Sequence, residues 1–92
     1  MNYITSIHPG LVLKDELEEI GVSQSEFARH IHVLPKTINE IINGKRGISP
    51  EMALSLSLAL GASPQFWMNL QNNWELSRVN RQNFKEIRKI AA

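Results

Sequence analysis

The stretch GVSQSEFARHIHVLPKTINEIINGKR, residues 21–46, constrains the fold more than any other part of the chain. Ser23 can cap a helix, and Glu26 three residues later completes a capping box. Pro35 suits the first position of a second helix, because that position needs no N–H group. Gly44 can end this helix, since a glycine just past a helix adopts the left-handed conformation without a Cβ clash. The stretch therefore predicts two short helices joined by a tight connection and closed by a basic loop.

The second of these helices is amphipathic. Its apolar face is expected to hold Leu34, Ile38, Ile41 and Ile42. Its opposite face carries amides and charges, with a hydroxyl at the flank: Lys36, Asn39, Glu40, Asn43 and Thr37. Such groups can hydrogen-bond base edges in a major groove, so we predict a helix-turn-helix with residues 35–43 as its recognition helix. The alternative is an ordinary helical hairpin with a solvated polar face.

The remaining helices are predicted from caps and early prolines. His8-Pro9-Gly10 opens a first helix, whose inner face is expected to hold Leu13, Leu17 and Ile20. Ser49-Pro50 and Ser63-Pro64 open two more, at residues 50–60 and about 64–78. The helix at 50–60 is apolar nearly all round, so we expect it to be the most buried. No strand is needed, and the fold class is therefore an all-α, compact five-helix bundle.

The two ends of the chain lack the clear helical patterns of this bundle. Tyr3, Ile4 and Ile7 could pack as an N-terminal arm or a short strand within residues 1–8. Residues 79–92 form a weakly amphipathic basic tail, which is a sixth helix, a partner-binding segment or a partly disordered one. We predict one domain at residues 1–78, with the helix-turn-helix at about 24–43, followed by this tail.

Charge distribution says more than the net charge of +1. Residues 1–26 carry one basic residue against five acidic ones, whereas residues 78–92 carry five basic residues against one acidic residue. Such asymmetry suits one surface that faces phosphate and another that does not. The chain has no cysteine, which fits a cytoplasmic location, and it has neither a membrane-length apolar run nor a signal pattern.

Other kinds of site are weakly supported. Glu26, His30 and His32 invite a metal interpretation, but His32 points away from the other two and no fourth ligand is evident. An enzyme is not expected, because no catalytic triad, phosphate-cradling glycine loop or inward carboxylate pair is present. The aromatic set Phe66, Trp67 and Trp74 is expected in the core, with a dimer or partner interface as the alternative.

Four segments together resemble one family. They are His8-Pro9-Gly10, GVSQSEFA at 21–28, TINEIINGKRGISPEMAL at 37–54 and ALGASPQFWMNLQNNWEL at 59–76. They are similar to the HigA/VapI-type antitoxins of toxin–antitoxin modules, within the Xre/Cro/cI class of helix-turn-helix regulators. The resemblance covers about residues 7–78. It implies a lambda-repressor-like bundle and a cytoplasmic homodimer that binds double-stranded operator DNA, represses its own operon and pairs with a HigB-like ribonuclease toxin. It implies no cofactor and no membrane.

The resemblance also implies roles for individual residues. Gln24 would clamp a phosphate, Lys45 and Arg46 would lie over the DNA backbone, and the groove-facing set would be Pro35, Lys36, Thr37 and Glu40, flanked by Asn39 and Asn43. One departure concerns Leu34, where relatives often have a small polar capping residue. Either water caps the recognition helix, or Leu34 packs as an apolar lid over the turn.

Two functions follow from these observations. The first is a sequence-specific transcriptional repressor. The second is a protein-interaction module that neutralises a toxin, in which the helix-turn-helix is only a scaffold and the basic tail binds the toxin. Both can hold at once, and a stand-alone Xre-type regulator without a toxin is a further alternative.

Overall fold

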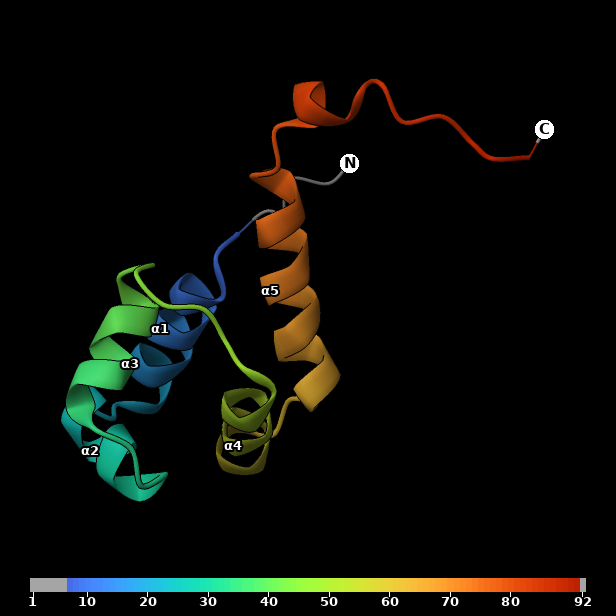
Figure 1. Cartoon of the computed structure of the whole chain (residues 1–92). Helices are drawn as coiled ribbons and strands as arrows, with labels where there is room; N and C mark the ends of the chain where they lie inside the picture. The colour runs from blue at the N-terminus through green and yellow to red at the C-terminus, as the bar shows by residue number, and fades with distance from the viewer. Residues whose placement is uncertain (1–6, 92) are drawn as a thin grey trace.

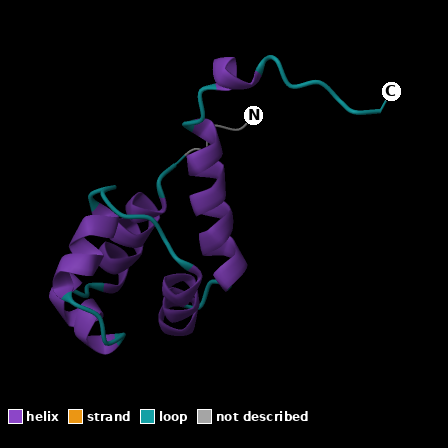
Figure 2. Ribbon diagram, in the orientation of Figure 1, coloured by secondary structure: helices purple, strands orange, loops and turns teal. Residues whose placement is uncertain are grey.

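The computed structural model describes residues 7–91 and contains five α-helices in this part of the chain, with no strand (Figures 1 and 2). The helices are α1 (Pro9–Ile20), α2 (Gln24–His30), α3 (Pro35–Ile42), α4 (Pro50–Leu60) and α5 (Pro64–Ser77). In Figure 1, α1, α2 and α3 gather on one side, while α4 and the long α5 form the other side. The most extensive helix contacts are α2 with α3, α1 with α3, α4 with α5, and α1 with α5. The predicted all-α five-helix bundle is confirmed.

Serine caps open three of the helices as the sequence predicts. The hydroxyls of Ser23, Ser49 and Ser63 each accept the backbone N–H group three residues later, at 3.0–3.1 Å. The Glu26 carboxylate in turn accepts the Ser23 backbone N–H at 3.1 Å, which completes the capping box. These bonds satisfy N–H groups that a helix leaves without an intrahelical partner.

Three helices end in the same way, with a residue of positive φ in a Schellman motif. This residue is Gly21 after α1 (φ 72°) and Gly44 after α3 (φ 74°), as expected. After α2 it is His32 (φ 63°), whose N–H donates to the Arg29 carbonyl while the next N–H donates to the Ala28 carbonyl. Histidine tolerates this conformation better than most side chains. The helix-turn-helix connection therefore makes its left-handed step without a glycine.

The core lies between all five helices. Its wholly buried side chains are Leu13, Ala28, Ile38, Ile41, Ala53, Leu56 and Trp67. The closest backbone approach is that of α1 to α3: a Cβ on Gly10 would lie 1.9 Å from the Ile41 carbonyl oxygen. Only glycine fits there, and this contact fixes α3 against the first turn of α1.

Four apolar side chains expected inside are exposed. Ile20 is 54 % exposed and Leu34 is 70 % exposed, so neither belongs to the inner face assigned to it, and Leu34 is not a lid over the turn. The helix α4 is not the most buried one, because Leu54 and Leu58 face outward while Met52, Ala53 and Leu56 face the core. A helix of this length packed against a single layer of neighbours buries only one stripe.

The C-terminal segment runs away from the bundle (Figure 1). Instead of a sixth α-helix, its described part holds one short 3-10 helix, η2 (Arg81–Phe84), followed by extended chain. Phe84, Ile87 and Ile90 are exposed along it. An N-terminal arm is expected at residues 1–8, and residues 1–6 of it lie outside the described part of the chain.

His8 links the start of α1 to α5. Its Nδ1 atom accepts the Gly10 N–H at 2.9 Å, and its ring meets the Trp74 ring edge-on at 4.7 Å. The Arg78 guanidinium lies over the Trp74 ring, 5.2 Å from its centroid. Burial lowers the pKa of His8 below its ordinary value of 6.5.

Stability should therefore depend on pH through His8. Protonated Nδ1 cannot accept the Gly10 N–H, and the unfolded chain takes up this proton more readily, so the contribution is complete above about pH 6.5 and is lost as pH falls. His8→Asn keeps a capping oxygen but does not titrate. Between pH 7.5 and 5.5, urea unfolding should show a larger loss of stability for the wild type than for His8→Asn. Equal losses would contradict the assignment of Nδ1 as the cap.

Candidate nucleic-acid interface

The nine residues proposed to face DNA lie on one continuous part of the molecule, which we call the α3 face. It comprises the first residue of α2, the outer side of α3 and the loop that follows: Gln24, Pro35, Lys36, Thr37, Asn39, Glu40, Asn43, Lys45 and Arg46. Gln24, Thr37 and Glu40 are half-buried, and the other six are exposed. Hydrogen bonds and ion pairs join six of them, Gln24 with Asn39 and Asn43, and Glu40 with Lys36 and Arg46. Pro35, Thr37 and Lys45 lie on the same helix or in the loop that follows it.

The orientation of α3 follows from its buried side. Ile38 and Ile41 are fully buried and Ile42 is 8 % exposed, so the opposite side of the helix must face solvent. The Leu34 side chain makes no cap hydrogen bond, and α3 begins at Pro35, as predicted. The helix therefore presents its polar side from its first turn onward.

Three amide side chains are joined in a chain across α2 and α3. The Nδ2 group of Asn39 donates to the Oε1 atom of Gln24 at 3.2 Å, and Nδ2 of Asn43 donates to Oδ1 of Asn39 at 3.1 Å. Because Oε1 of Gln24 is occupied, its Nε2 group remains as a donor toward solvent. A side-chain amide that presents N–H groups at a helix N-terminus is well suited to a phosphate oxygen.

Glu40 lies at the centre of the basic residues. Its Oε1 atom accepts from both Nε and Nη2 of Arg46, at 2.9 and 2.8 Å, while the Lys36 ammonium is 4.0 Å from Oε2. The hydrogen bonds from Arg46 hold the pKa of Glu40 below its ordinary value, and nearby Lys36 and Lys45 act in the same direction. The carboxylate is therefore ionised at neutral pH and restrains Arg46.

The basic loop, residues 44–48, starts from a defined helix end. The Lys45 N–H donates to the Glu40 carbonyl at 2.8 Å, and the Gly44 N–H donates to the Ile41 carbonyl at 3.0 Å. Ile48 closes the loop with only 4 % of its side chain exposed. Lys45 and Arg46 therefore project from a short segment whose two ends are anchored.

Lys14 is a further candidate that the sequence interpretation missed. It is the single basic residue of the acidic N-terminal region, and the structure places it beside Gln24, Asn43 and Gly44 around a cavity of about 470 Å³. Its helical position on α1 leaves it exposed. A lone lysine among acidic residues was the available signal, but only the packing of α1 against α3 brings it to this face.

The three aromatic residues occupy different environments. Trp67 is fully buried in the core, and Phe66 meets it edge-on at 5.3 Å while keeping 41 % of its surface exposed. Trp74 is half-buried between His8 and Arg78. Only Phe66 and Trp74 therefore retain surface with which another molecule could make contact.

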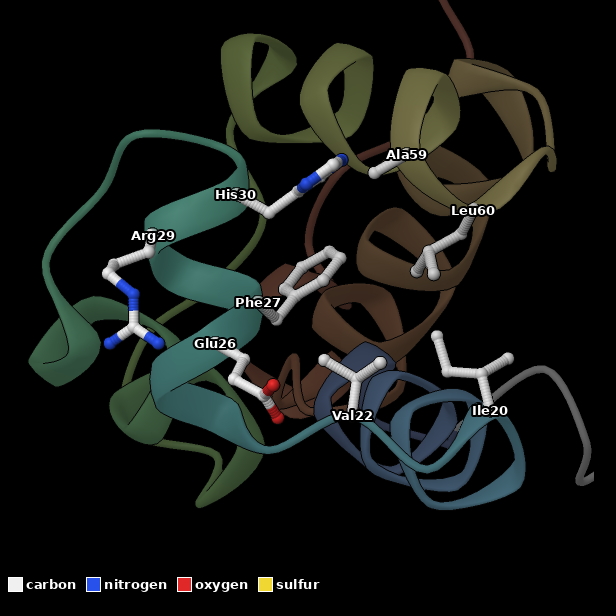
Figure 3. Close-up of a pocket in the computed structure, with 8 residues that line it drawn as sticks. All are labelled: Ile20, Val22, Glu26, Phe27, Arg29, His30, Ala59 and Leu60. Carbon is white, nitrogen blue, oxygen red and sulfur yellow. The ribbon is translucent and has the colours of Figure 1, made fainter.

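An apolar groove of about 500 Å³ lies between α2, α4 and the end of α1 (Figure 3). Phe27, Val22 and Leu60 converge on it, and Glu26, Arg29 and His30 stand on the α2 side. None of the α3-face residues lines it. Among residues 7–91 no group of three potential metal ligands comes together, and Glu26 instead serves the capping box.

The middle of the chain, from α1 into α5, carries the features of a known family. The helix-turn-helix family matches residues 13–67, from α1 into α5, which is more than half of the chain. This chain belongs to the helix-turn-helix family. The resemblance to its HigA/VapI-type branch, found in the sequence, is confirmed by relatives and by solved structures.

One relative and two solved structures illustrate the likeness. The HTH-type transcriptional regulator YddM of Escherichia coli K12 is 42 % identical over 73 residues, which cover 79 % of this chain and 78 % of YddM. The structure of Pseudomonas aeruginosa antitoxin HigA with the higBA promoter has a TM-score of 0.84 and 40 % identity, covering 92 % of this chain and 98 % of that one. Antitoxin GraA in complex with its operator has a TM-score of 0.83 and 34 % identity, covering 94 % and 92 %.

No helix in the described part of this helix-turn-helix protein combines the length and the apolar character that crossing a membrane requires.

Proposed function

We propose that this helix-turn-helix protein is a sequence-specific DNA-binding transcriptional regulator, and that it is the antitoxin of a HigBA-type toxin–antitoxin module that represses its own operon. The observation that carries the proposal is the α3 face: three buried isoleucines turn a polar, basic-flanked helix side outward. The same fold is found in antitoxin HigA with the higBA promoter and in antitoxin GraA with its operator.

Within the α3 face we assign two kinds of contact. Pro35, Lys36, Thr37 and Glu40 would face the major groove, with Asn39 and Asn43 beside them, where amides and ammonium groups can read base edges. Gln24, Lys45 and Arg46 would contact phosphates, and we add Lys14 to this set because it lies beside Gln24. Phosphate contacts fix the position of the protein, whereas base contacts supply specificity.

We propose that the active form is a homodimer. Two recognition helices read successive major grooves when they lie about 34 Å apart, which one copy of α3 cannot do alone. Exposed apolar residues on α5 and on the tail favour an interface there rather than on the α3 face: Phe66 at the start of α5, and Leu76, Val79, Phe84, Ile87 and Ile90 at its end and beyond. This interface involves α5 and the tail.

The second candidate function is toxin neutralisation by protein contact, and the tail is the observation that favours it. Residues 79–91 extend away from the bundle and combine exposed apolar side chains with basic ones. Such a segment suits a partner that is acidic and partly apolar.

We propose a division into a DNA-binding domain at residues 1–78 and a basic tail at 79–92. We further propose that the protein is cytoplasmic, is not an enzyme and needs no cofactor.

Substitutions on the α3 face should separate base reading from phosphate binding. Lys36→Ala should change base preference at one or two positions of each half-site, at a cost of about 1–3 kcal/mol for the preferred base. Lys45→Ala should weaken all sequences alike and lower the salt slope of binding by about one. Fluorescence anisotropy titrations on the upstream palindrome and on scrambled duplexes of equal length measure both effects. An equal loss on both duplexes for Lys36→Ala would remove its base-reading role.

Glu40 should limit binding to non-specific DNA. Glu40→Gln removes a negative charge from the α3 face and leaves Arg46 with a weaker, neutral acceptor, so affinity for scrambled DNA should rise and its salt dependence should steepen. Glu19→Gln on the outer side of α1 makes the same charge change elsewhere and serves as the control. An equal change in the two variants would mean that only net charge matters.

Toxin binding can be tested separately from DNA binding. Co-expression with the adjacent reading frame, in which only the partner carries an affinity tag, should recover the full chain. Removal of residues 79–92 should reduce this recovery while operator binding by the α3 face is retained. Full recovery without the tail would place the toxin contact elsewhere.

A further inference from the structure

We propose that Gln71 on α5 is a positioning residue that holds the basic loop in place for phosphate contact, with Glu75 orienting its amide. The inference rests on the proposed function, because it concerns how the DNA-facing loop is held. Gln71 lies outside the α3 face, and α5 contributes no residue to that face.

Gln71 is unusual in its burial. It is 4 % exposed and is the only buried polar or charged side chain found within residues 7–91. Its Oε1 atom accepts the Ile48 N–H at 2.6 Å, across 23 positions of the chain. Buried polar groups are normally hydrogen-bonded, and here the partner is the backbone at the end of the basic loop. One side chain therefore joins α5 directly to the loop that carries Lys45 and Arg46.

The loop approaches this amide more closely than most residues would allow. A Cβ on Gly47 would lie 2.7 Å from Nε2 and 2.9 Å from Cδ and Oε1 of Gln71. The amide therefore packs directly against the bare Cα of Gly47, and a larger residue there would have to displace either the loop or the Gln71 amide, which disturbs the hydrogen bond to Ile48. The same amide thus makes both the hydrogen bond to Ile48 and the close contact with Gly47.

Glu75 determines which way the amide faces. Its Oε2 atom accepts from Nε2 of Gln71 at 2.9 Å, one helical turn along α5. A carboxylate only accepts hydrogen bonds, so it selects the NH₂ end of the amide and leaves the carbonyl oxygen for Ile48. Glu75 itself is exposed and can be changed without opening the core.

The two anchors of the loop explain what Gln71 positions. At the α3 end, the Lys45 N–H donates to the Glu40 carbonyl and Arg46 is held by the Glu40 carboxylate. At the other end, Ile48 is held by Gln71. Without the second anchor the Ile48 N–H is buried and unsatisfied, so the loop must shift to find another acceptor. Such a shift moves Lys45 relative to α3.

A double-mutant cycle separates positioning from a merely structural role. Gln71→Met keeps a long unbranched side chain but removes the amide, and we expect about tenfold weaker operator binding with a shallower salt slope. In a Lys45→Ala, Arg46→Ala background the same change should cost less than about twofold, because the groups it positions are gone. All four proteins are compared at a temperature at which circular dichroism shows each to be folded. Equal losses in both backgrounds would overturn the inference.

Changes at Glu75 keep the test available if Gln71→Met does not fold. Glu75→Ala and Glu75→Gln alter the net charge equally, but only Gln offers an oxygen that can accept from Nε2 of Gln71. We expect Glu75→Ala to bind operator more weakly than Glu75→Gln and to show faster amide exchange at Ile48. Identical affinities and identical exchange for the two variants would refute the positioning role.

Operator binding by the wild type distinguishes a wrong role for Gln71 from a wrong proposed function. Wild-type protein that does not distinguish operator from scrambled DNA overturns the proposed function and the positioning role with it. Specific binding by the wild type, together with additive losses in the cycle, overturns the role of Gln71 alone.

Discussion

The contact between α1 and α3 is the constraint on which the rest of the structure depends. The bare Cα of Gly10 lies against the Ile41 carbonyl, and the isoleucines of α3 belong to the same core cluster as Leu13 of α1. Burying each isoleucine contributes about 1.5–3 kcal/mol, far more than any exposed ion pair of the α3 face can. Burial of the isoleucines therefore sets the orientation of α3 about its own axis, and this orientation turns the polar side of the helix toward solvent. The sites proposed for base reading need not contribute to stability.

Local signals in the sequence predicted most of the helices. Serine caps, early prolines and terminal glycines act within three or four residues, so they can be recognised without knowing what lies nearby. The exposure of Ile20, Leu34 and Leu58 could not be predicted in this way, because it depends on which neighbour covers each side of a helix. The left-handed His32 was missed for a related reason: its conformation is fixed by the way α2 must turn into α3.

Some residues of the candidate site could likewise be predicted from local sequence, whereas others depend on packing between distant elements. The residues on α3 and in the basic loop could be proposed from spacing alone, since they share one helix and its end. Lys14 and Gln71 could not, because each reaches the site through packing between elements far apart in the sequence. The hydrogen bonds from Arg46 to Glu40 were also not foreseen, and they change the interpretation of both residues, since a restrained arginine is a weaker phosphate ligand than a free one.

The central claim is that DNA meets the outer side of α3 and not the basic tail, although both are positively charged. Backbone amide NMR spectra of the full chain, titrated with the operator duplex at physiological salt, test this claim most directly. The account predicts that the largest changes fall at the start of α2, along residues 35–43 and in the basic loop, with small changes in α4. Changes confined to residues 78–92, with α3 unaffected, would contradict it.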